Sequence, residues 1–528
     1  MAQELRSINL VAPAFKGINT EDSPIAQDPS FAEVADNAVI DKRGRIAARK
    51  GYDVLTTDRS ELLNTTPDPD VYEPVRAIGE FRDSGGSAND VIFSVGNNKI
   101  LSGTTTFTDA SATLVSGGYT ISENNWKMVN FNDHMYFFQR GYKPLVYNTS
   151  IGALVAMDDS SVTGNSGVAS TMYGNEVLAA YGRLWTADFN NDKSTIYWSD
   201  LLIGHSWSGG TSGSINLAKV WPDGYDEIVA LAAHNNALII FGNHSIVVYG
   251  GANAPATMAL ADTVSGVGCV DRDTVQYTGT DVIFLSHTGL RSFGRTIQEK
   301  SMPISSLSNT ITKDIIGLIQ GETEFFRSIY SPEENFYLLT FVGQNTTFCF
   351  DVRGTLEDGS FRVTRWPGSV FTAYERLANG TLYVGSTAGI SEYKGYSDNG
   401  SSYRFKYFSP SLTFGDTSRL KILKKIKPTL VGANSATVFM KFAYDFSTSY
   451  RTTKFTAGNQ NPAFYNVNEF GENSNPLSEF TGGELTNQLS LNAVGSGTTV
   501  VVGLESDISG FALSLQEINV QALLGKTI

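Results

Sequence analysis

Apolar and polar positions along the chain form a recurring pattern: an apolar strand, a short break rich in Gly, Asn or Ser, and a second apolar strand. In the stretch 235–250, NNALIIFGNHSIVVYG, the run from Leu238 to Phe241 is apolar throughout, so this strand has no polar face for water. Gly and Asn in the breaks tolerate the positive φ that tight hairpin turns require. The pattern occurs seven times, beginning at Asp90, Asp133, Gly182, Asn235, Asp281, Asn335 and Gly380.

The spacing of these hairpins predicts the architecture. Successive copies begin 43 to 54 residues apart, and roughly 40 to 50 residues is the usual length of a four-stranded propeller blade. Radial stacking covers both apolar faces of each hairpin. We therefore expect an all-β chain with a β-propeller of six or seven blades, because the first and last hairpins can combine into one. The uneven spacing leaves a β-sandwich array or a β-solenoid open as the alternative.

Segments on both sides of the repeats complete the expected organisation. Residues 1–55 form an N-terminal arm, 56–395 the propeller-like repeats, and 396–528 an antiparallel β platform or sandwich that the arm joins. In the arm, Asp28 followed by Pro29 predicts a short helix that ends near Asn37. A hairpin that turns at Arg43 and Gly44 is expected next.

Composition and net charge favour some classes of protein and argue against others. The 51 Gly, 31 Phe and 23 Tyr, with 17% charged residues, favour strands and tight turns. A net charge of -14 argues against a sequence-reading nucleic-acid binder, which needs a basic face to neutralise phosphates. Two cysteines, Cys269 and Cys349, make no disulfide framework and favour a reducing compartment. We expect no membrane segment and no signal peptide, because no window is apolar over the length of a membrane helix.

The sequence contains no recognisable catalytic or metal-binding motif. The five histidines do not occur at zinc-type spacing, and neither a phosphate loop nor a nucleophile elbow is present. Glu333 and Glu334, in the stretch SPEEN, fit a solvated turn better than an acid–base pair. We therefore expect no enzymatic activity, no cofactor and no metal.

Two basic clusters stand out against the acidic background, one in the arm and one in the stretch SRLKILKKIKP. The simpler interpretation of the second cluster is a half-buried strand with a solvated outer face, because apolar residues alternate with its charges. The sharper one is an electrostatic contact with an acidic neighbouring subunit or partner. The candidate interface residues are Arg43, Arg45, Arg49, Lys50, Lys421, Lys424, Lys425 and Lys427.

The arm also carries a resemblance to a known family. Its run GINTEDSPIAQDPSFAEVADNAVIDKRGRIAARKGY resembles the opening of tail nozzle (tail tube or hub) proteins of short-tailed bacteriophages, which typically begin with a GGINT segment and a strand pair ending in R.GY. Similar stretches follow in order: IYWSDLLIGHSW, DGYDEIVALAAHNNALIIFGNHSIVVYGG and TVSGVGCVDRDTVQYTGTDVIFLSHTGLRSFG. They cover the arm and the middle of the chain.

The resemblance implies a structural virion protein of the phage tail, assembled in the host cytoplasm. It implies a homo-hexameric ring below the portal and the adaptor (head-to-tail connector) ring, with a propeller and a β-rich platform in each subunit. Genomic DNA would pass through the channel without sequence-specific binding, and tail fibres, spikes or a needle would dock on the ring. The family supplies no catalytic residues.

Two other functions stay open at this point. A propeller that binds host-surface glycan would use aromatic side chains, and Trp185, Trp198 and Trp207 lie close together in the sequence. A propeller glycosidase would need a catalytic carboxylate, and no residue stands out for that role.

Overall fold

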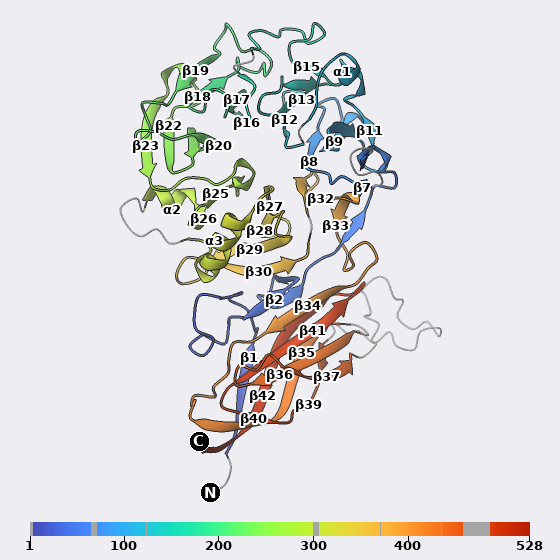
Figure 1. Ribbon diagram of the computed structural model, residues 1–528, viewed down its shortest axis with the longest axis vertical. Helices are drawn as coiled ribbons and strands as arrows, with labels where there is room; N and C mark the ends of the chain where they lie inside the picture. The colour runs from blue at the N-terminus through green and yellow to red at the C-terminus, as the bar shows by residue number, and fades with distance from the viewer. Residues whose placement is uncertain are drawn as a thin grey trace, which may run out of the picture. The chain divides into compact units, whose positions relative to one another are not determined.

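The computed structural model (Figure 1) describes residues 4–64, 71–122, 124–169, 172–298, 306–369, 371–433, 436–457 and 486–527. Contacts divide the chain into two units. The propeller unit comprises 54–346 and 369–393; the platform unit comprises 1–53, 347–368 and 394–528. Both are rich in strands, which confirms the expected all-β class of a propeller with additional β-sheet. Residues 347–368, expected within the repeats, belong to the platform unit.

Four blades of the propeller are antiparallel sheets in which consecutive strands pair. The first comprises β8 (Ala77–Phe81), β9 (Val91–Gly96), β10 (Lys99–Ser102) and β11 (Thr108–Asp109); the second, β12 (Lys127–Phe131), β13 (His134–Phe138), β14 (Leu145–Tyr147) and β15 (Val155–Ala156). The third comprises β16 (Glu176–Ala180), β17 (Arg183–Ala187), β18 (Thr195–Trp198) and β19 (Gly213–Asn216); the fourth, β20 (Ile228–His234), β21 (Ala237–Gly242), β22 (Ser245–Gly250) and β23 (Ala259–Ser265).

The remaining strands complete the ring. Two further sheets are β24 (Gln276–Tyr277), β25 (Val282–Ser286) and β26 (Gly289–Ser292), and β31 (Ala373–Arg376), β32 (Leu382–Ser386) and β33 (Gly389–Tyr393). Between them lies the pair β27 (Phe326–Ser331) and β28 (Phe336–Phe341). The innermost strand β31 contacts β8, which closes the circle. The described part of the unit thus has six blades of three or four strands, and the β27–β28 pair occupies one further position.

The predicted hairpins are the middle strands of these blades. The stretch that begins at Asn235 forms β21 and β22, and the other copies form the corresponding strands. In the copy that begins at Asn335, β28 lies in the propeller unit and most of β29 (Thr346–Thr355) in the platform unit. In the copy that begins at Asp90, Asn97 (φ +49°) and Asn98 (φ +55°) form the tight turn between β9 and β10. The Asn-rich breaks therefore supply the positive φ that such turns require.

Neighbouring blades share apolar cores, which is why both faces of each hairpin are hydrophobic. Between the third and fourth blades, Trp185 and Trp198 pack in one buried cluster with Leu238 and Ile240. The cluster between the second and third blades contains Trp207. These tryptophans are at most 8% exposed, so they belong to the core.

The platform unit contains two sheets, and the arm contributes strands to both. One has the order β3 (Ala38–Ile40), β4 (Ile46–Ala48), β42 (Leu513–Thr527) and β35 (Arg419–Gly432), with β1 (Glu4–Val11) along β42 and the short strands β38 (Thr486–Gln488), β39 (Leu491–Asn492) and β40 (Ser496–Gly497) along β35. The other has the order β29, β30 (Phe361–Pro367), β2 (Val34–Asp36), β34 (Tyr403–Phe408), β41 (Val500–Ile508), β36 (Thr437–Tyr444) and β37 (Arg451–Thr456).

The helix predicted from Asp28 to Asn37 is wrong. The Asp28 carboxylate accepts the amide of Ser30 at 2.9 Å, and its carbonyl accepts the amide of Phe31 at 3.0 Å, which closes a single turn. The chain then extends into β2, which pairs with β34 and β30. Sheet pairing therefore outweighs the local capping signal. The hairpin at Arg43 and Gly44 is present as β3 and β4, with Gly44 at φ +78°.

Gly51, next to β4 in the platform unit, provides a test of this packing. A Cβ on Gly51 would lie 1.9 Å from the carbonyl oxygen of Ser397, so Gly51→Ala must displace backbone. We expect it to destabilise the platform by about 2–3 kcal/mol. Gly354→Ala is the control, because a Cβ there meets nothing within 4 Å. Amide hydrogen exchange of the platform strands measures both, and equal protection in the two variants would contradict the packing described.

Candidate functional site

The basic cluster of the arm is largely internal to the platform unit. The Arg49 guanidinium donates to both carboxylate oxygens of Asp398, at 2.8 and 2.7 Å, and to Oδ1 of Asn37 at 3.1 Å. It also stacks 4.1 Å from the centre of the Tyr403 ring. Arg45 donates from Nε to Asp41 at 2.7 Å. Both arginines are at most 5% exposed, so their charges are compensated within the unit.

The second basic cluster lies on β35 and is divided between interior and surface. Lys421 is fully buried and its ammonium donates to the carbonyl of Asp416; burial lowers its pKa. Lys424 and Lys425 are exposed, and Lys427 is half-buried. A bulge between Leu423 and Lys425 allows two consecutive lysines to face solvent. The strand therefore combines a packed inner face with a solvated outer one.

These positions revise the candidate interface. Arg45, Arg49 and Lys421 were predicted as interface residues, but burial and internal partners remove them from the accessible surface. Arg43, Lys424 and Lys425 are exposed, and Lys50 and Lys427 are half-buried. Sequence shows that a residue is charged, but it does not show whether a carboxylate 349 positions away, such as Asp398 for Arg49, compensates that charge.

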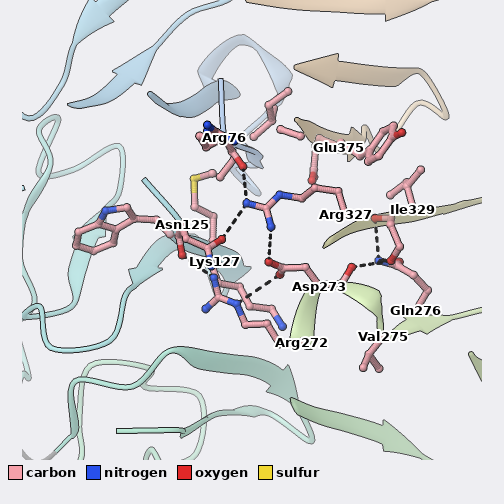
Figure 2. A pocket seen from close by; sticks show the side chains of 17 residues that line it. Arg76, Asn125, Lys127, Arg272, Asp273, Val275, Gln276, Arg327, Ile329 and Glu375 are labelled. Atoms are coloured by element: carbon pink, nitrogen blue, oxygen red, sulfur yellow. Dashed lines mark hydrogen bonds and ion pairs between the residues drawn. The ribbon is translucent and has the colours of Figure 1, made fainter. Parts of the chain in front are cut away.

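A polar cavity of about 240 Å³ lies among the innermost strands of the propeller unit (Figure 2). Its lining comes from the beginnings of β8, β12, β27 and β31 and from the short 3-10 helix η5 (Arg272–Thr274) with the residues that follow it. Four cationic side chains line it: Arg76, Lys127, Arg272 and Arg327. The lining carboxyl groups are Asp273 and Glu375.

Arg327 on β27 links the surrounding blades. Its Nε donates to the carbonyl of Thr372 at 3.1 Å, and its Nη1 donates to Asp273 at 2.9 Å and to the carbonyl of Phe326 at 3.0 Å. Its Nη2 donates to the carbonyl of Arg76 at 3.1 Å and to Oδ1 of Asn125 at 2.9 Å. These bonds use all the N–H groups that a guanidinium has. Burial lowers its pKa, while Asp273 opposes that shift.

Two further charged groups extend the network to the remaining blades. Arg272 donates from Nη1 to Asn175, at 2.9 Å, and from Nη2 to the carbonyl of Asn125, at 2.5 Å. Lys127 on β12 donates to both oxygens of Glu176 on β16, at 2.8 and 2.7 Å. The Glu176 carboxylate also accepts the amide of Leu231 on β20 at 3.3 Å. Side chains near the axis therefore connect every blade position of the ring.

The two lining carboxyls differ in protonation. Burial and the neighbouring Glu80 raise the pKa of Glu375 to about 8. Burial also acts to raise the pKa of Asp273, but Arg272 and Arg327 outweigh it and hold that pKa below its ordinary value. A neutral and an ionised carboxyl resemble an acid–base pair in protonation. However, the Asp273 carboxylate accepts from Arg327, which also binds four other acceptors, so its evident role is to hold the blades.

Sequence reasoning missed this network, although it left a signal. Arg327 stands in the strand FRSIYS directly after Phe326, and Arg272 stands in DRDT beside two aspartates. An arginine inside an apolar strand is rarely buried without partners. That rule predicts a buried ion pair, but the partners come from positions up to 251 residues away.

The described part of the chain contains neither a group of metal ligands nor a helix that could span a membrane. Within it, no three potential His, Cys, Asp or Glu ligands gather into a group that could hold a metal ion. None of its helices is long and apolar enough to cross a membrane. Cys269 and Cys349 are buried and not bonded to each other.

Comparisons with known proteins give only distant structural likenesses. No family model matches the chain, and no curated protein matches it. Among solved structures, it is similar to the extracellular domain of the putative one component system BT4673 from B. thetaiotaomicron, at 12% identity and TM-score 0.39, over 68% of this chain and 46% of that one. PorZ of the Porphyromonas gingivalis type-IX secretion system shares 12% identity at TM-score 0.35, over 77% and 46%.

A third similar structure is the Pan2 WD40 domain of Neurospora crassa, at 8% identity and TM-score 0.33, over 61% of this chain and 88% of that one. The chain spans about half the length of the first and second structures. With identities and TM-scores this low, these likenesses carry no argument about the fold or the function.

Replacing Arg327 tests its role in holding the blades together. Arg327→Met leaves Asp273 and four further acceptors without this donor, and breaking a buried ion pair typically costs about 3–5 kcal/mol. Arg376→Gln is the control, because Arg376 forms an exposed ion pair with Glu333, worth about 1 kcal/mol or less. Urea unfolding of the propeller measures both. Equal losses in the two variants would show that Arg327 does not hold the ring together.

The raised pKa of Glu375 makes the stability of the propeller depend on pH. Its pKa in the folded chain is about 8, above an ordinary value of 4.5, so folding favours the protonated form. Its contribution to the unfolding free energy is complete below about pH 4.5 and is lost as the pH rises to about 8. Relative to Glu375→Gln, the wild type should therefore lose stability across this range. A difference between the two proteins that does not vary with pH in thermal melts would refute the assignment.

Proposed function

We propose that this chain is a structural virion protein, the subunit of a hexameric tail nozzle in a short-tailed phage. In this proposal the ring forms the DNA-ejection channel below the portal and adaptor rings. Tail fibres or spikes dock on its outside. The chain performs no chemistry, and its function lies in the surfaces and the channel that six copies create.

The observation that carries the proposal is the structural role of the run that resembles nozzle proteins. That run ends in Arg49, Gly51 and Tyr52, the R.GY element of the resemblance. Arg49 forms the bidentate pair with Asp398 and stacks on Tyr403. Gly51 lies where a Cβ would collide with the backbone of Ser397. The motif residues are therefore those by which the arm is built into the platform, the part that makes the ring in the implied family.

Two further properties agree with this proposal. The charged groups that line the propeller cavity are largely engaged in joining blades, Arg327 with all its N–H groups. The net charge of -14 suits a channel that DNA must pass, because a basic wall would retain phosphates. Both properties are expected of a scaffold subunit.

The tryptophans that were candidates for binding glycan are buried. Trp185, Trp198 and Trp207 are packed between blades, so they offer no stacking surface to a sugar. The large exposed aromatics Tyr225 and Tyr277 come from different parts of the propeller chain. We therefore retain the nozzle as the proposed function.

Cryo-electron microscopy of the particle that contains this chain tests the proposal. We expect six copies around an acidic channel, with the platform strands at the subunit contacts. The double variant Lys424→Glu/Lys425→Glu should reduce incorporation into particles, and higher salt should mimic its effect, because surface charge contacts are screened. Lys219→Glu, an exposed lysine of the propeller, is the matched control. Particles without a six-fold ring of this chain would refute the nozzle; normal incorporation of the double variant would refute only the lysine contact.

A further inference from the structure

The propeller cavity contains cationic N–H groups for which the described residues supply no acceptor. Nε of Arg272 is buried and has no hydrogen-bond acceptor among the described residues; Oδ1 of Asp273 lies 3.5 Å away as an ion-pair partner. Each Nη group of Arg272 donates one of its two hydrogens. Lys127 uses two of the three hydrogens of its ammonium on Glu176. The donor capacity of the cavity therefore exceeds its acceptors.

The lining of the cavity carries more cationic than acidic side chains: four cations, but only Asp273 and Glu375 as carboxyl groups. The ion pairs of the four lining cations involve three carboxylates: Glu324, Glu176 and Asp273. Glu375 adds little negative charge near neutral pH, because burial raises its pKa to about 8. Asp271, which does not line the cavity, has a pKa that burial and Asp273 raise only to about 6, so it is mostly ionised near neutral pH and offsets part of the positive charge. The lining itself, with four cations around one ionised carboxylate, still attracts an anion.

We propose that this cavity is a binding site for a compact oxyanion of the size and charge of phosphate or sulfate. Figure 2 shows Arg76, Lys127 and Arg272 among the side chains around it. A volume of about 240 Å³ holds such an ion together with water, since one water takes up roughly 30 Å³ of liquid. The free hydrogens of Arg272 and Lys127 donate to the oxygens of the anion. Arg76, directly before β8, adds a third positive charge.

The affinity of this site for an oxyanion should depend on pH. Glu375 on β31 neighbours Glu80 on β8, whose charge helps to raise its pKa, and it lines the cavity together with Arg76 and Arg327. Protonated Glu375 can donate a hydrogen bond to an oxyanion, whereas ionised Glu375 repels it. Binding therefore weakens as the pH rises through about 8. Sulfate is the informative probe, because its own charge stays constant across this range and any change in affinity reports on the protein.

Titration calorimetry of the full chain with sulfate, at constant ionic strength set with chloride, tests the proposal. We expect one saturable site, weakened roughly tenfold by Arg76→Gln, the size of one charge-assisted hydrogen bond. Arg76 is chosen because its carboxylate partner Glu324 is exposed, so the variant leaves no buried charge unpaired. Arg376→Gln, which lies on β31 outside the cavity lining, should bind as the wild type does.

A second measurement does not depend on any variant. Selenate replaces sulfate in crystals or in solution, and its anomalous signal should lie in the cavity beside Arg272. No saturable binding to the folded wild type, equal loss in Arg76→Gln and Arg376→Gln, or selenate bound only elsewhere would each overturn the proposal. A site that binds sulfate equally well on both sides of about pH 8 would remove the part assigned to Glu375.

Discussion

Arg327 has almost no access to water, and its guanidinium must find its hydrogen-bond acceptors on the strands around it. Those acceptors lie just before β8, β12 and β31 and in η5. Blades of a propeller contact only their neighbours through apolar cores, which specify little about the ring as a whole. The buried guanidinium of Arg327 finds all its acceptors only when several blades have assembled, so it favours the complete ring over partial arrangements.

The platform uses the same principle at a smaller scale. Arg49 is buried between Asp398, Asn37 and Tyr403, and it joins the arm to segments more than 300 residues later in the chain. In both units an arginine, with its rigid planar fork, holds together pieces that are distant in sequence. This explains why an acidic chain keeps arginines such as Arg49 and Arg327 in its interior, while Lys424 and Lys425 on β35 are exposed.

The sequence predicted the repeated hairpins because their apolar runs and Asn-rich turns are local signals, as at Leu238 and Asn235. It misplaced the segment from Asp28 to Asn37, where a strand partner 372 residues away, Tyr407 for Ala35, decides the conformation. It also treated Arg45, Arg49 and Lys421 as surface charges, since burial depends on partners that a single sequence does not reveal. The cavity was missed for the same reason, because its lining residues meet only in the closed ring.

The pairing of β1 with β42 has a consequence for synthesis. Glu4 pairs with Leu524, so the first strand of the platform leaves the ribosome long before its neighbour exists. At about 5–20 residues per second, that interval is roughly 25–100 s. The propeller unit, residues 54–346 and 369–393, is synthesised completely within this interval. A chain interrupted before β42 would then display finished blades but no platform, so a partner that recognises the platform would select for completed chains.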